Sequence, residues 1–109
     1  MANHLKVLGQ LLPSANTLSN VYTVPAGNSV VVSTITVCNV GAANATFSLA
    51  VQPSGAAINN KHYIAYNTTI TSYDTITLTL GLGLSANDVI SANVNVSNVA
   101  IGVFGSEIY

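Results

Sequence analysis

One stretch of the chain alternates strictly between polar and apolar residues, and a second separates its large apolar residues onto one face. TITLTL, residues 75–80, places its threonines on one face of an extended chain, and ATFSLAVQ, residues 45–52, places Ser48, Ala50 and Gln52 on one face. A period of two is typical of β-strands that bury one face. The residues that we expect to face the core are Phe47, Leu49, Val51, Ile76, Leu78 and Leu80.

A longer stretch, NSVVVSTITVCN at residues 28–39, also predicts a strand. Thr34 and Thr36 are expected on one of its faces, and the opposite face is expected to carry Ser33, Ile35 and Val37. No stretch repeats apolar residues at the spacing of a surface helix.

Gly, Pro and Asn separate these strands. In VPAG, residues 24–27, Pro25 suits position i+1 of a type I turn and Gly27 suits position i+3. The strands that we predict are 5–12, 19–24, 29–38, 45–52, 61–66, 74–80, 88–96 and 98–105. Eight short strands at this spacing predict an all-β fold, a single jelly-roll-like antiparallel β-sandwich.

A chain of 109 residues is expected to form one domain. Residues 1–12 are apolar, although Lys6 interrupts them, and they precede a break at residues 13–16. We predict that residues 1–12 form an N-terminal arm outside the sandwich that reaches a neighbouring subunit, and that residues 13–109 form the sandwich domain. The interruption also argues against a secretory signal, whose apolar core is continuous.

The surface must be unusually poor in charge. Only 5% of the residues are charged, whereas an ordinary soluble domain carries about 25%. Polarity comes instead from 13 Asn, 11 Ser and 11 Thr. Near-zero net charge favours association, so we predict a homo-oligomer. Two lysines cannot form a cationic surface for nucleic acid, and no apolar run approaches the roughly 18 residues of a membrane-spanning helix. We therefore expect neither nucleic acid nor a membrane as a partner.

Few side chains are suited to catalysis or metal binding. His4 and His62 are far apart in the chain, and the carboxylates match no zinc or calcium spacing. Asp74 and Asp88 have the sequence context of turn residues whose carboxylates accept backbone hydrogen bonds. Cys38, at a strand end, is predicted to be a buried, unreactive thiol. His62 could be combined with Asp74 or Cys38, but no nucleophile motif is present, so we predict no enzyme, no cofactor and no metal.

The stretch NKHYIAYN, residues 60–67, concentrates chemistry that is rare elsewhere in the chain. As a strand at 61–66, it places Lys61 and Tyr63 on one face and His62 and Tyr66 on the other. Tyrosine is common at protein interfaces. Two interpretations stay open: these four residues form a strip that contacts another subunit or a ligand, or the strand covers the core and leaves its hydroxyls at the edge.

Four segments, in their order, resemble a group of small virion proteins of tailed bacteriophages. They are YTVPAGNSVVVSTITVCNVGAANATFSLAV, NKHYIAYNTTI, TITLTLGLGLSANDVISA and VFGSEI. The resemblance covers roughly Leu12 to Ile108. The chain departs from the family pattern near the loop VQPSG: we expect many relatives to carry a basic residue there, where this chain has Gln52.

This resemblance implies an all-β structural protein of the phage particle and brings no catalytic residues. The role that we expect is a capsid decoration (cement) protein on the particle exterior, assembled in the host cytoplasm. Its partners would be copies of itself, as a homotrimer or alternatively a homodimer, and the major capsid protein or other virion subunits. Two other roles stay open: a small tail or fibre-base component and, from another class, a carbohydrate-binding β-sandwich module, although the chain has no Trp for a sugar platform.

Overall fold

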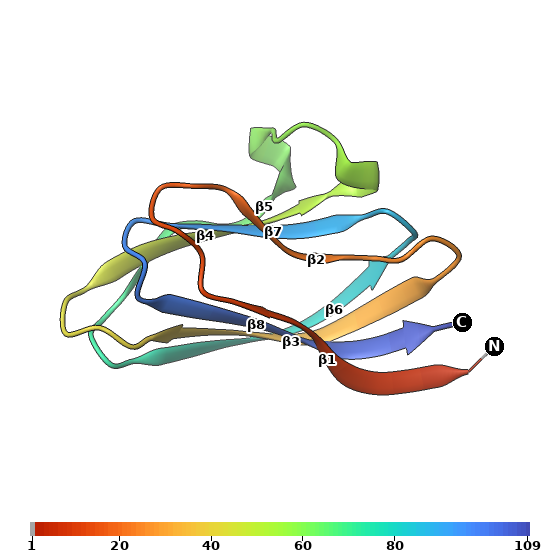
Figure 1. The fold of residues 1–109 in the computed structure, drawn as a ribbon, viewed down its shortest axis with the longest axis horizontal. Helices are drawn as coiled ribbons and strands as arrows, with labels where there is room; N and C mark the ends of the chain where they lie inside the picture. The colour runs from red at the N-terminus through yellow and green to blue at the C-terminus, as the bar shows by residue number, and fades with distance from the viewer. Residues whose placement is uncertain (1) are drawn as a thin grey trace.

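The computed structural model describes residues 2–109, which fold into two antiparallel sheets of four strands each (Figure 1). Sheet A has the strand order β1-β8-β3-β6, and sheet B has the order β2-β7-β4-β5. This is the arrangement of a jelly roll, so the predicted fold class is confirmed. The elements are β1 (Asn3–Leu11), β2 (Ser19–Thr23), β3 (Ser29–Asn39), β4 (Ala45–Gln52), the 3₁₀ turns η1 (Pro53–Gly55) and η2 (Asn60–His62), β5 (Tyr63–Ile70), β6 (Thr75–Leu84), β7 (Val89–Val94) and β8 (Val99–Ile108).

The core lies between the sheets and uses the apolar face of each strand. Phe47 and Leu49 are buried in the core cluster, and the apolar side chains of β6, in the opposite sheet, pack against this cluster, as the alternation predicts. Because apolar burial contributes roughly 25 cal/mol per Å², this inner layer supplies the main stabilising term. The predicted core residues that lie in or against the core are Phe47, Leu49, Val51, Ile76, Leu78 and Leu80.

A β-bulge in β3 reverses one predicted orientation. The register with β8 shifts between Val32 and Thr34, so that Ser33 turns outward and is exposed. Ile35 and Val37 face the core as predicted. The prediction for Ser33 is wrong because a bulge inserts one residue into a strand and breaks the alternation on which the prediction depends.

The turn after β2 is displaced by one residue from its predicted position. The Asn28 N–H donates to the Pro25 carbonyl oxygen over 3.2 Å, which places Pro25 at position i rather than i+1. Gly27 is then at i+2 with a φ of 84°, where glycine is favoured because it has no Cβ. The turn at residues 85–88 has the same pattern, with Asn87 at a φ of 70°.

β1 is an edge strand of sheet A rather than an arm outside the sandwich. Asn3–Leu11 pair with β8, and the Ala2 N–H donates to the Tyr109 carbonyl oxygen over 2.9 Å. Ala2 and Tyr109 therefore lie side by side, and β1 runs along β8 (Figure 1). The predicted arm at residues 1–12 is corrected accordingly, because backbone pairing and the inward packing of Leu8 hold this segment in the domain. Met1 lies outside the described residues.

The segment between β4 and β5, residues 53–62, arches over the outer side of sheet B (Figure 1). The outward side chains of β4 are buried: Ser48 is 5% exposed, Ala50 0% and Gln52 9%. The Ser91 hydroxyl of β7 donates to Gln52 Oε1 over 2.5 Å, and the Gln52 amide donates to the Ala56 carbonyl oxygen over 2.8 Å. These bonds tie the covering segment to the sheet.

Candidate binding surfaces

The outer side of sheet A is uncovered, and it carries no charged residue among residues 2–109. We define this sheet-A face by its outward residues, which are Leu5, Val7 and Gln10 of β1, Ala100, Gly102, Phe104, Ser106 and Ile108 of β8, Val31, Thr34, Thr36 and Cys38 of β3, and Thr75, Thr77 and Thr79 of β6. Leu5 is 86% exposed, Val7 49% and Val31 42%. Another protein can cover such a face without desolvating an ion, which would be costly.

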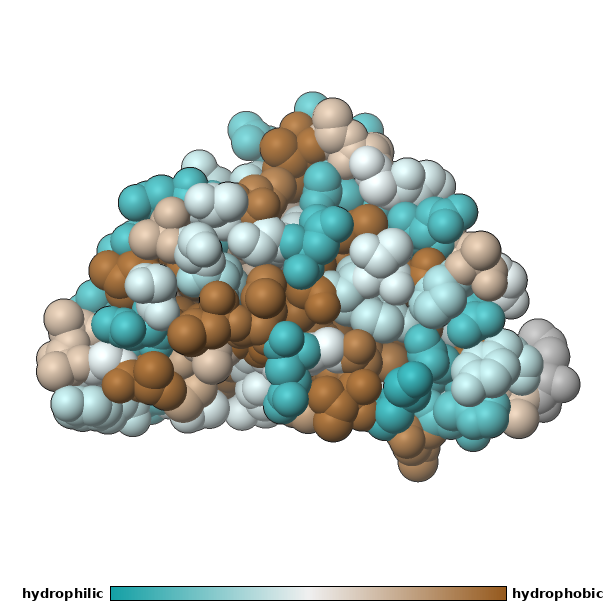
Figure 2. All heavy atoms as spheres, viewed as in Figure 1, coloured by the Kyte–Doolittle hydropathy of each residue, from teal (hydrophilic) through white to brown (hydrophobic). Residues whose placement is uncertain are grey.

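The molecule as a whole shows the same scarcity of charge. Figure 2 shows hydrophobic residues reaching the surface across the middle of the molecule and along its lower margin, interspersed with hydrophilic ones. Only five residues are charged in total, two Lys and three acidic residues. Hydroxyl and amide groups therefore provide most of the polarity of this surface.

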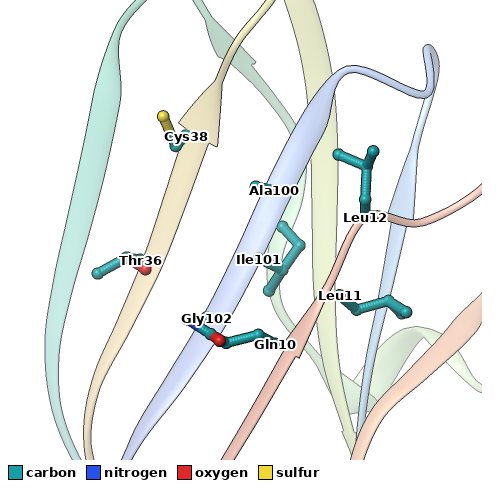
Figure 3. Close-up of a pocket in the computed structure, with 8 residues that line it drawn as sticks. All are labelled: Gln10, Leu11, Leu12, Thr36, Cys38, Ala100, Ile101 and Gly102. Atoms are coloured by element: carbon teal, nitrogen blue, oxygen red, sulfur yellow. The ribbon is translucent and has the colours of Figure 1, made fainter. Parts of the chain in front are cut away.

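A shallow hollow of about 390 Å³ lies on the sheet-A face over β8 (Figure 3). Its floor contains Ala100 and Gly102, and Thr36 and Cys38 of β3 flank it on one side while the end of β1 flanks it on the other. Cys38 is therefore half-buried and faces outward, which corrects the prediction of a buried thiol. The reason is the alternation within β3, because Val37 takes the inward position beside it.

The four predicted interface residues fall into two separate pairs. Lys61 and His62 belong to η2 rather than to a strand, and they line a groove of about 590 Å³ that also contacts Gly81 and Gly83 of β6. His62 is 8% exposed, and its Nδ1 accepts a hydrogen bond from the Asn59 N–H over 3.1 Å. The imidazole thus closes the first turn of η2, which is a structural role.

Tyr63 and Tyr66 form the second pair, on the outer side of sheet B. Their ring centroids are 4.8 Å apart with an interplanar angle of 71°, an edge-to-face contact. The register of β5 against β4 shifts on both sides of Leu49, so additional residues in β5 bring both rings to one side. The prediction that these tyrosines lie on opposite faces is therefore wrong, as is the strand start at residue 61.

The tyrosine pair borders a polar hollow of about 210 Å³ that we call the Asn/Tyr hollow. Asparagines from distant parts of the chain meet there, which explains why sequence reasoning missed it: nothing in the sequence marks them as neighbours. Its lining residues are Asn16, Thr46, Ser48, Tyr63, Tyr66, Asn67, Asn93, Val94 and Asn95. A second hollow of about 270 Å³, lined by Asn60, Tyr63 and Tyr66, shares both tyrosines with the first.

The two aspartates with the sequence context of turn residues accept hydrogen bonds in turns. Asp88 accepts hydrogen bonds from the Ser54 N–H over 2.8 Å and from the Ser85 N–H over 2.9 Å. Asp74 accepts one from the Thr75 N–H over 2.8 Å. The prediction that both carboxylates bond to nearby backbone groups is confirmed. Each aspartate therefore stabilises a turn next to β6 or β7.

A buried cluster at the edge formed by β1, β2 and β8 was not predicted from the sequence. Glu107 is 4% exposed; it accepts hydrogen bonds from Lys6 Nζ over 2.8 Å and from the Tyr22 hydroxyl over 2.6 Å. The Lys6 ammonium, and after it the Tyr22 hydroxyl, lowers the pKa of the Glu107 carboxyl. Glu107 in turn raises the pKa of Lys6. Burial, followed by the bond to Glu107, raises the pKa of Tyr22.

This cluster joins the two sheets, because Tyr22 belongs to sheet B and its partner Glu107 belongs to sheet A. Residues of opposite charge in the first and last strands, Lys6 and Glu107, were the available sequence signal. Lys6 and Tyr22 both donate to Glu107, and Tyr22 and Glu107 are at least partly buried, so the cluster stabilises the sandwich edge.

Within residues 2–109, no three His, Cys, Asp or Glu side chains group closely enough to hold a metal ion. The described chain also contains no helix with the length and hydrophobicity to cross a membrane. No protein-family model and no curated protein matches this chain. The proposals that follow therefore draw on its surfaces and on the resemblance described above.

Proposed function

We propose that this chain is a structural subunit of a tailed-phage particle, a capsid decoration protein that acts as a homotrimer. The observation that carries the proposal is the sheet-A face, which is broad, uncharged and uncovered. The order of motifs that resembles small phage virion proteins supports it independently. The jelly roll supports it more weakly, because viral capsid proteins and lectins both use this fold.

In the proposed ring, the sheet-A face of each copy packs against the next copy. The molecule extends 44 × 27 × 19 Å, and Figure 1 shows the sheets edge-on, so the sheet-A face lies within the 44 Å and 19 Å extents of the molecule. A face of this size is comparable with the roughly 800 Å² that one partner buries in a standard interface. Cyclic closure then prevents the contact from propagating into fibres.

The proposed mechanism of head stabilisation is mechanical. Pulling neighbouring virion subunits apart re-exposes apolar surface, at a cost of roughly 25 cal/mol per Å² before the entropic terms of association. The contact repeats over the shell, so the resistance to internal pressure grows with the number of copies. No chemical step is involved.

The decisive experiment is a quantitative gel of purified particles that contain this chain. We expect a band whose molar ratio to the major capsid protein corresponds to hundreds of copies per particle. A ratio that corresponds to a dozen copies or fewer would instead assign the chain to the tail or fibre base. The virion role would be overturned altogether if the chain is absent from purified particles although the host cells that produced them expressed it.

A further inference from the structure

We propose that the Asn/Tyr hollow binds a neutral oligosaccharide, with one sugar residue in the hollow and the next on the far side of the tyrosine pair. The site lies on the outer side of sheet B, opposite the sheet-A face. It therefore shares no residue with the sheet-A face, and it goes beyond the structural role proposed above.

The hydrogen-bonding groups of the hollow are available to a ligand. Among residues 2–109, no protein group bonds to the side chains of Asn16, Asn67 or Asn93, or to the hydroxyls of Tyr63 and Tyr66. Each carboxamide offers both donors and an acceptor. A sugar, whose hydroxyls both donate and accept, matches this set better than a ligand that only donates or only accepts.

The tyrosine pair supplies the apolar part of the site. Tyr66 is 62% exposed, and the edge-to-face contact with Tyr63 fixes its orientation. The negative face of an aromatic ring attracts the C–H groups of a pyranose face. Both hollows, of about 210 and 270 Å³, share this pair, so one ring pair can contact two consecutive sugar residues. Each hollow is below the roughly 300–1,000 Å³ of sites for drug-sized ligands, which suits a single sugar unit.

The lining is uncharged, which sets the class of oligosaccharide. None of the residues that line the two hollows is Lys, Arg, Asp or Glu. An acidic sugar would lose hydration there without gaining a cationic partner. The ligand is therefore neutral.

The backbone holds the site in place before any ligand arrives. Asn67 has a φ of 46° and Asn16 a φ of 57°, and the Asn67 N–H donates to Ser48 Oγ over 2.9 Å. Asn95 Oδ1 accepts a bond from the Thr46 N–H over 2.8 Å, which anchors the neighbouring wall. A preorganised site loses little conformational entropy on binding.

The test uses the full-length protein on an array of neutral and acidic oligosaccharides, followed by titration calorimetry with the best neutral glycan. Tyr66→Ala removes the exposed ring, and Asn67→Gly removes a carboxamide while keeping a residue that accepts a positive φ. Tyr73→Ala is the matched control, because Tyr73 is also exposed, at 73%, but lies outside both hollows. Circular dichroism verifies the fold of each variant.

We expect binding of neutral glycans by the wild type and by Tyr73→Ala, with a loss of affinity of about tenfold or more in Tyr66→Ala and a smaller loss in Asn67→Gly. If Tyr66→Ala does not fold, Tyr66→Phe and Asn67→Gly still decide the outcome through the lost hydrogen bonds. The proposal is overturned if no glycan binds, if only acidic glycans bind, or if folded hollow variants bind like the wild type. None of these results bears on the copy number of the chain in particles. The oligosaccharide site can therefore be refuted while the virion role stands, and the reverse.

Discussion

The outer sides of the two sheets use similar residues in opposite ways. On the sheet-A face, Thr75, Thr77 and Thr79 are exposed and residues 2–109 provide no cover. On the outer side of sheet B, Ser48 and Gln52 are buried, and Gln52 bonds to the segment at residues 53–62. In a chain with 5% charged residues, polarity alone does not distinguish surface from interior, because hydroxyls and amides can be buried wherever they find partners.

The two sides should therefore respond differently to substitution. A hydroxyl on the sheet-A face exchanges bonds with water, so its loss changes the stability of the domain little. A polar group under the covering segment bonds only to protein, so its loss leaves a partner unsatisfied. Conversely, an added charge is tolerated by the isolated domain on the sheet-A face but disrupts any contact made through that face.

The largest effect is expected from a charge on an interior strand of the sheet-A face, β3. Val31→Lys, alone or with Leu5→Lys, places an ammonium group on the surface that the proposed trimer shields from water. An ammonium buried at an interface without a partner costs several kcal/mol, so the trimer should weaken by about a hundredfold or more and the 11.2 kDa monomer should appear in light scattering.

The matched control is Val40→Lys, since Val40 is 56% exposed but lies in the loop after β3. In light scattering, this variant should have the same oligomeric state as the wild type. A wild-type protein that is a monomer at high micromolar concentration would refute the trimer, and a trimer that survives Val31→Lys would move the contact away from the sheet-A face.

The next largest effect is expected beneath the covering segment. Gln52→Ala leaves the Ser91 hydroxyl, which is fully buried, without its acceptor and removes the bond to the Ala56 carbonyl. The free energy of unfolding should fall by about 2–3 kcal/mol in urea denaturation. Thr77→Ala on the open face should change it by less than about 0.5 kcal/mol. Equal losses for the two variants would contradict the contrast between the two sides.

The cluster at the sandwich edge predicts a smaller, pH-dependent effect. Tyr22→Phe removes one hydrogen bond to Glu107 and should cost about 1–2 kcal/mol at neutral pH. The Glu107 pKa is lower in the folded protein than its ordinary value of 4.5, so its stabilisation is present above that value and is lost as the pH falls through the folded pKa. The difference in stability between wild type and Glu107→Gln should therefore shrink in acid.

Urea denaturation of both proteins at pH 7 and pH 3 measures this difference. If the difference in free energy of unfolding between wild type and Glu107→Gln is the same at both pH values, the charge of Glu107 does not contribute to the stability of the protein. The raised pKa of Lys6 acts at the other end of the scale, where its contribution is lost only in strong alkali.

The sequence was sufficient to predict the eight strands and the core-facing residues of β4 and β6, because those strands alternate without interruption. It was insufficient where the register shifts: Ser33, and the pair Tyr63 and Tyr66, lie at bulges that depend on the partner strand. The Asn/Tyr hollow and the Glu107 cluster join residues from distant segments. Such groupings follow from the order of strands in each sheet, which an alternating pattern does not specify.

The smallest effect is expected for the rate at which a thiol reagent labels Cys38. This measurement probes the sheet-A face without a substitution at Cys38. The thiol is half-buried and lines the hollow over β8, so a monomer should expose it to a thiol reagent while the proposed trimer covers it. Labelling of the wild-type trimer should be several-fold slower than labelling of Val31→Lys, and both should be slower than labelling of the urea-unfolded chain. Val40→Lys should label at the wild-type rate, because it leaves the trimer intact. Equal rates for wild type and Val31→Lys, with the trimer dissociated only in the variant, would show that the contact leaves this end of β3 open and lies toward Leu5 and Val7 instead.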